Sequence, residues 1–153
     1  MNRFKLILKY LFLFMLGGAA YVSIELLYRG YSHISMFIVG GSCFLFIGLI
    51  NEILTWETYI ELQVLYGLIF TLCLEFVSGC ILNLWLKLDI WDYSNLPFNI
   101  LGQVCLPFAL IWIPVILFGI VLDDYVRYKL FNEEKPRYRS WILEKIKKKN
   151  NLK

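Results

Sequence analysis

The sequence predicts an all-α integral membrane protein: a four-transmembrane-helix bundle with a long aromatic outer loop and a basic cytoplasmic tail. The chain of 153 residues is 59% hydrophobic and 18% aromatic, well above the usual composition of a soluble domain. Its charges gather at the ends, because eight of its 15 Lys and Arg follow residue 134 and three more precede Tyr10. Between the ends lie apolar stretches of roughly 20 residues, which is the length of a helix that crosses the ~30 Å hydrocarbon core of a bilayer.

The first two predicted spans are 6–28 and 34–54, joined by the short loop 29–33. A basic start before an apolar run is also typical of a secretory signal peptide, but we interpret this one as a membrane helix. In the second span Gly41 and Gly48 lie on one face. Small residues on a face allow two helices to approach closely, so we expect this face to pack against a neighbour.

The third predicted span, 63–88, carries a carboxylate at its centre. Helical spacing places Thr71, Glu75, Gly79 and Asn83 on one stripe of this helix. A carboxylate at the middle of the bilayer costs about 2.5–3.5 kcal/mol or more when it faces lipid. The stripe must therefore face other protein or water.

The outer loop, 89–102, is rich in aromatic residues yet contains several Asp and Asn side chains. Such a mixture suits a partly buried cap at the level of the lipid headgroups. The fourth predicted span, 103–122, contains Pro107 and Pro114, each of which removes a backbone donor. We expect a kink or a break in this helix.

The chain divides into a membrane domain, 1–131, and a basic amphipathic tail, 132–153. Trp141, Ile142 and Ile146 can lie on the membrane surface while the lysines bind anionic lipid, at roughly 1 kcal/mol per charge. Both basic ends are predicted to be cytoplasmic, which requires an even number of spans in a multi-pass protein of the cell membrane. The net charge of +3 reflects this topology and contact with membrane lipids, and we expect no nucleic acid partner.

The predicted topology collects polar side chains into an outer layer and a cytoplasmic layer, with Glu75 between them. In the cytoplasmic layer Asp123 and Arg127 have the i, i+4 spacing of an ion pair at a helix end that we expect to be solvated. Glu25 and Arg29 have the same spacing in the outer layer. The predicted substrate-binding residues are Glu25, Arg29, His33, Glu75, Asn83, Asp92, Asn99 and Gln103.

No pattern in the sequence indicates a metal or cofactor site. The four cysteines form no CxxC pair and the one histidine, His33, is far from them in the sequence. Cys73 and Cys80 are about 10 Å apart on one helix, which is too far for a disulfide. We expect no cofactor, and we assign no catalytic residue.

Two segments resemble the signature segments of a known family. They are E-L-L-Y-R-G-Y-S-H-I-S-M-F-I-V-G-G (Glu25–Gly41) and W-D-Y-S-N-L-P-F-N-I-L-G-Q (Trp91–Gln103). In this order they are similar to the small membrane family labelled putative ABC-transporter type IV (CmpB-like), to which the vertebrate transmembrane protein 229 group is similar. The resemblance covers about residues 10–132 and implies a four-helix integral membrane protein, often described as a permease. The chain itself has no GxxxxGK[ST] phosphate loop.

Three functions are compatible with these residues. The first is a permease-like transport component, in which Glu75 exchanges a proton or binds a cationic group and the Glu25–Arg29 pair gates the outer end. Because four helices enclose little volume, we expect it to form a homodimer or a larger complex. The second is a membrane enzyme or binding protein for a lipid or lipid-linked substrate, with Glu25, His33 and Asp92 as acid–base groups and Arg29 on a phosphate or carboxylate. The third is a structural or regulatory subunit whose buried polar groups only fix helix packing.

Overall fold

The computed structural model describes residues 3–150, apart from the side chain of Asn51, and within them the protein is all-helical. The elements in chain order are α1 (Arg3–Arg29), α2 (Ile34–Ile53), α3 (Ile60–Gly79), the π-helical segment η1 (Cys80–Trp85), α4 (Leu106–Phe131) and α5 (Trp141–Asn150). Three of the described helical stretches, Arg3–Arg29, Ile60–Trp85 and Leu106–Phe131, are long and apolar enough to cross a membrane, while the apolar part of α2, Ile34–Ile50, is shorter. The fold is therefore that of a multi-pass membrane protein.

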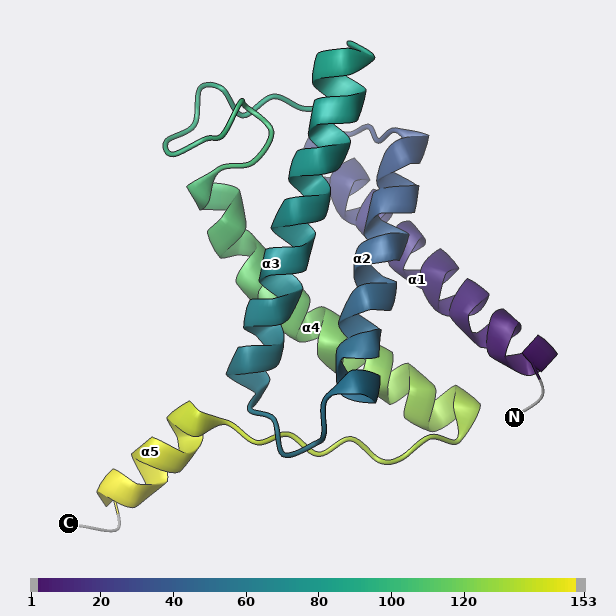
Figure 1. Ribbon diagram of the computed structural model, residues 1–153, viewed down its shortest axis with the longest axis vertical. Helices are drawn as coiled ribbons and strands as arrows, with labels where there is room; N and C mark the ends of the chain where they lie inside the picture. The colour runs from purple at the N-terminus through teal and green to yellow at the C-terminus, as the bar shows by residue number, and fades with distance from the viewer. Residues whose placement is uncertain (1–2, 151–153) are drawn as a thin grey trace.

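Different connections and chain segments lie at the two ends of the bundle (Figure 1). The loop end carries the 30–33 connection and the long connection 86–105. The tail end carries the start of α1, the 54–59 connection and the chain that leads into α5. The closely packed helix pairs are α1–α2, α2–α3, α2–α4 and α3–α4. α1 therefore packs mainly against α2, and α4 packs against α2 and α3.

The pair α1–α2 packs through small residues, as expected for helices in a membrane. A Cβ at Gly17 would lie 2.2 Å from the Cβ of Phe44, and a Cβ at Gly41 would lie 2.7 Å from the backbone oxygen of Phe14. Gly48, which was predicted to share this face, instead lies against the carboxylate of Asp123 on α4. Gly41 therefore packs against α1, whereas Gly48 packs against α4.

The predicted stripe of α3 is buried along its whole length: Thr71, Glu75 and Asn83 are buried, and so is Gly79. The helix differs from the prediction at its end, because regular α geometry stops at Gly79 and a π-helical segment continues to Trp85. Below this stripe, towards the tail end, Ile47, Val64, Ile116 and Ile120 from α2, α3 and α4 form an apolar core.

The last span is longer than predicted and begins later. α4 starts at Leu106 rather than at Gln103 and continues to Phe131. The predicted break is wrong. Pro107 lies in the first turn of α4, where a backbone N–H has no partner within the helix, so its absence costs no hydrogen bond. The helix then continues through Pro114. α4 ends at Asn132, which adopts a left-handed conformation.

The predicted tail, 132–153, is anchored to the bundle before it extends away. The Arg139 carbonyl accepts a hydrogen bond from the Ile60 amide at 2.9 Å, and Glu61 accepts bonds from the Ser140 hydroxyl and from the first amides of α5. α5 then points away from the other helices (Figure 1). The last residues of the predicted tail, 151–153, lie outside the described part of the chain.

Candidate functional site

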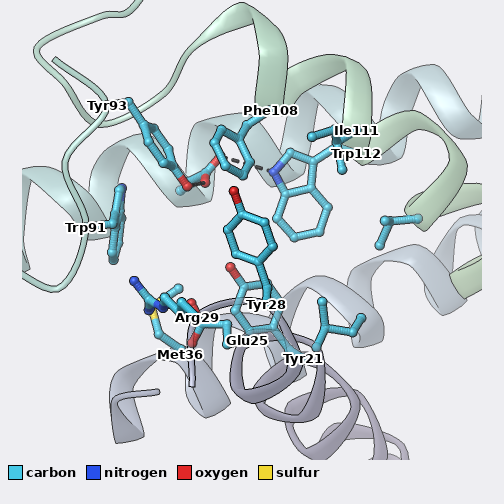
Figure 2. A pocket seen from close by; sticks show the side chains of 13 residues that line it. Tyr21, Glu25, Tyr28, Arg29, Met36, Trp91, Tyr93, Phe108, Ile111 and Trp112 are labelled. Carbon is cyan, nitrogen blue, oxygen red and sulfur yellow. Dashed lines mark hydrogen bonds and ion pairs between the residues drawn. The ribbon is translucent and has the colours of Figure 1, made fainter. Parts of the chain in front are cut away.

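A cavity of about 250 Å³ lies at the loop end, between α1, α3, α4 and the 86–105 connection. Figure 2 shows that its labelled side chains come from all sides of this space. Three charged side chains line it: Glu25, Arg29 and Glu75. Most of the remaining lining is aromatic, contributed by Tyr21, Tyr28, Trp91, Tyr93, Phe108 and Trp112.

Glu75 lies at the inner boundary of this cavity and is only 4% exposed. Its carboxylate accepts a hydrogen bond from the Tyr93 hydroxyl at 3.3 Å and another from the Trp112 indole N–H at 3.2 Å. Burial, followed by the charge of Glu75, raises the pKa of Tyr93, so its phenol stays protonated and acts as a donor. Among the described residues no cationic side chain forms an ion pair with Glu75.

Glu25 and Arg29 form an ion pair across one turn of α1, with Arg29 Nη2 and Glu25 Oε1 2.5 Å apart. Ser32 donates to the other oxygen of Glu25, also at 2.5 Å. Arg29 Nη1 donates to the backbone oxygen of Ile90 at 2.7 Å. The pair is therefore internally neutral, and it ties the end of α1 to the start of the long connection.

Asn83 and Gln103 lie beside the cavity rather than in its lining. The Asn83 amide donates to Gln103 Oε1 at 2.8 Å, and its oxygen accepts from the Ile90 amide at 2.8 Å. The Gln103 backbone oxygen accepts from the Trp91 indole N–H at 3.0 Å. A side chain at Gly79 would collide with Gln103, since its Cβ would lie 2.5 Å from Oε1. These two buried amides hold the 86–105 connection in place and so orient Trp91 towards the cavity.

Three more predicted site residues lie outside the cavity, in addition to Asn83 and Gln103. His33 is exposed and caps α2, with Nδ1 accepting from the Ser35 amide at 3.2 Å. Asp92 is exposed and accepts from the Ser94 hydroxyl and amide, and the Ser94 hydroxyl, with its amide, holds the pKa of Asp92 below its usual value. Asn99 bonds the backbone of Ser94, Leu96 and Gly102. All three stabilise local backbone structure.

The sequence analysis missed the aromatic residues from α1 and α4 that line the cavity. Tyr21 and Trp112 stack at 5.8 Å between ring centroids, so α1 and α4 meet there through their rings. On α1 the signal was present, because Tyr21, Glu25 and Tyr28 follow helical spacing on the same face as Arg29. On α4 the lining residues Phe108, Ile111, Trp112 and Val115 also follow helical spacing on one face.

A second cluster of charges lies at the tail end, and it corrects the expectation of a solvated helix end. Asp123 is 0% and Arg127 3% exposed, with Arg127 Nε 2.5 Å from Asp123 Oδ2. Arg127 also pairs with Glu52 at 2.5 Å, and the buried Lys9 pairs with Glu52 at 3.0 Å and with Glu133 at 2.5 Å. We name these five residues the tail-end charge cluster. Lys9, Asp123 and Arg127 are buried, whereas Glu52 and Glu133 are partly exposed. Gly48 leaves room for the Asp123 carboxylate.

Comparison with known proteins identifies the family of this chain. No curated protein and no solved structure matches it. Residues 12–144 match the family described as "Putative ABC-transporter type IV". This match spans most of the chain and includes the residues that line the cavity, the 86–105 connection and four of the five residues of the tail-end charge cluster, since Lys9 lies before it. With three apolar membrane-length helices and this match over residues 12–144, the chain belongs to the family described as "Putative ABC-transporter type IV".

Proposed function

We propose that the protein is a permease-like component of membrane transport, whose substrate site is the loop-end cavity. The observation that carries the proposal is that one cavity is lined both by the Glu25–Arg29 pair at the end of α1 and by Glu75, a buried acid in the last part of α3. Substrate sites of transporters commonly lie near the middle of the bilayer. A buried acid that borders an open space is more consistent with a ligand than with packing alone.

The proposal includes four spans, with α2 as the fourth. α2 has 20 residues, which as a helix extend for about 30 Å, the thickness of the hydrocarbon core. It packs against α1, α3 and α4, so it lies inside the bundle and not on its surface. Four spans put both termini on one side, and the basic residues at the tail end favour the cytoplasmic side of the cell membrane. We also retain the homodimer or larger complex as part of the proposal, because four helices enclose little volume.

The two other functions find less support. For an enzyme acting on a lipid-linked substrate, His33 and Asp92 would have to face the reacting bond, but both are exposed and bound to neighbouring serines outside the cavity. For a purely structural subunit, Glu75 would be enclosed by its partners. Its two hydrogen bonds are long, at 3.2 and 3.3 Å, and a cavity borders it.

The test is solute uptake into proteoliposomes. Vesicles carrying the wild type, Glu75→Gln or Glu57→Gln are incubated with a defined mixture of small cationic, anionic and neutral solutes, and their contents are measured by mass spectrometry. We expect at least one solute to enter wild-type vesicles faster than protein-free vesicles. Glu75→Gln should slow its entry by about tenfold or more, since it removes the charge at the cavity.

Glu57→Gln is the matched control. Glu57 is an exposed carboxylate that pairs with Arg139 at the tail end, at 2.7 Å, so the same change there should leave uptake unaltered. Entry that is equal in wild-type and protein-free vesicles for every solute in the mixture would contradict the transport proposal. Entry that is equally fast in the wild type and Glu75→Gln would contradict the role of the cavity acid.

A further inference from the structure

The loop-end cavity contains one carboxyl group, that of Glu75, with which no cationic side chain in the described part of the chain forms an ion pair. Glu25 is neutralised by Arg29 at 2.5 Å and also accepts from Ser32. Glu75 receives only the neutral N–H and O–H donors of Trp112 and Tyr93. A carboxylate has roughly four acceptor positions, so Glu75 retains capacity for a further donor from the cavity side.

The lining around this charge is aromatic. Trp112 and Tyr93 contact the carboxylate directly, and Phe108 stacks on Tyr93 with 4.5 Å between ring centroids. Figure 2 shows the rings of Trp91, Tyr93, Phe108 and Trp112 arranged around the space. Faces of such rings attract cations within about 6 Å, and aromatic cages of this kind recognise ammonium groups.

From these two features we propose that the loop-end cavity binds a small organic ammonium group, with its charge against Glu75 and its alkyl groups against the aromatic rings. This inference rests on the proposed function and names the substrate class of the same site. An anion is disfavoured because Glu75 would repel it and the charge of Arg29 is already paired with Glu25. A neutral polar solute is disfavoured because the rings offer it few partners.

The volume limits the size of the ligand. The cavity of about 250 Å³ is below the usual range of roughly 300–1,000 Å³ for drug-sized ligands. It therefore suits a compact head with short alkyl substituents. The same chemistry occurs in a free amine and in the headgroup of a zwitterionic lipid, so the experiment includes both.

The experiment is calorimetric titration of the purified full chain in a detergent that contains no amine. The first probes are choline and 3,3-dimethylbutan-1-ol, which has the same shape but no charge. We expect choline to bind at least about tenfold more tightly than the neutral alcohol, because only choline gains from the carboxylate and the ring faces. Ethylammonium tests whether a primary amine is accepted, and a short-chain phosphatidylcholine against a short-chain phosphatidylglycerol tests the lipid source.

Two pairs of variants test whether choline binds in the cavity, at Glu75 and against the ring of Tyr28. Glu75→Gln should abolish the preference for choline, while Glu57→Gln keeps it. Tyr28 is exposed at the edge of the cavity, so its replacement does not threaten the fold. Tyr28→Leu should weaken choline binding several-fold, whereas Tyr28→Phe, which keeps the ring, should not.

Each outcome either identifies the source of the ammonium group, a free amine or a lipid headgroup, or contradicts the proposal. Binding of choline supports a free amine as ligand, and binding of phosphatidylcholine alone supports a lipid headgroup. Equal affinity for choline and the neutral alcohol, or choline binding that is unchanged in Glu75→Gln, overturns the ammonium site. Uptake of an anion or a neutral solute that depends on Glu75 would leave the transport proposal intact and overturn this one. Glu75-dependent ammonium binding without uptake of any solute would support the ammonium site and contradict the transport proposal.

Discussion

At the scale of single residues, the absence of a side chain at position 48 is what admits a charge to the interior. A Cβ on Gly48 would lie 2.3 Å from Asp123 Oδ2 and 2.4 Å from its Cγ. No real Cβ approaches another atom so closely, and the carboxylate cannot move away without leaving Arg127, to which it is bound at 2.5 Å. Gly48 and the Asp123–Arg127 pair therefore form one packing unit.

This geometry predicts the effect of Gly48→Ala. The added methyl group should destabilise the protein by about 1–3 kcal/mol, the usual cost of overpacking a core. The measurement is the free energy of unfolding in detergent micelles. Gly119→Ala is the control, because its Cβ would meet only Ile47, at 3.8 Å, which is ordinary contact. Because alanine is otherwise favoured over glycine in a helix interior, equal losses in both variants would show that the cost does not come from the contact with Asp123.

The residue scale also shows why part of the site was predictable. Glu75 was predictable because a carboxylate in the middle of an apolar span must be buried against protein or water, and the structure buries it. The Glu25–Arg29 pair followed from spacing alone. His33, Asp92 and Asn99 were chosen because they are polar and near one end, but that criterion does not distinguish a side chain that lines a cavity from one that bonds its own loop.

At the scale of elements, the helices followed from hydrophobic length, and the errors concern their ends. A helix boundary depends on local caps and on neighbours, so the π-helical end of α3 and the late start of α4 left no signal in composition. The extension of α4 to Phe131 buries charges that the sequence analysis placed in water. Arg127 pairs with Glu52 of α2, which in turn pairs with Lys9 of α1; these partners are far apart in the sequence, and no local pattern connects them.

The tail is the element whose prediction can be tested most directly. α5 carries Lys145, Lys147, Lys148 and Lys149, and Trp141, Ile142 and Ile146 are exposed. Such a helix should lie on an anionic membrane surface. We expect amide hydrogen exchange in 141–150 to be roughly tenfold slower or more in bilayers with phosphatidylglycerol than in bilayers of phosphatidylcholine alone.

The control for the tail is the triple change Lys147→Gln, Lys148→Gln and Lys149→Gln. It removes the attraction to the anionic surface while the anchor at Glu61 stays intact. Exchange should then be the same in both kinds of bilayer. If the unmodified tail exchanges equally fast in both, α5 does not bind anionic lipid and the contact with Glu61 alone determines its position.

At the scale of the whole molecule, the two ends of the bundle differ in how α1 and α4 are joined. At the tail end Phe12 of α1 and Phe131 of α4 contact each other with ring centroids 6.0 Å apart, and Lys9 pairs with Glu133, just beyond α4. At the loop end the cavity lies between the same two helices. The tail-end charge cluster thus joins α1, α2 and α4 at the end opposite the loop-end cavity.

Because Asp123 and Arg127 are both buried, removing one of them should cost far more than removing a surface charge. Arg127→Gln leaves Asp123 buried without its counter-ion and should lower the free energy of unfolding by about 3–5 kcal/mol. Arg137→Gln makes the same change in an exposed pair with Glu134 and should alter it little. The double variant Asp123→Leu with Arg127→Leu should recover most of the loss, since it removes the unpaired charge together with its partner. If instead Arg127→Gln unfolds no more easily than Arg137→Gln, water from the tail-end pocket that Lys9, Glu52 and Arg127 line solvates Asp123, and the pair does not stabilise the protein.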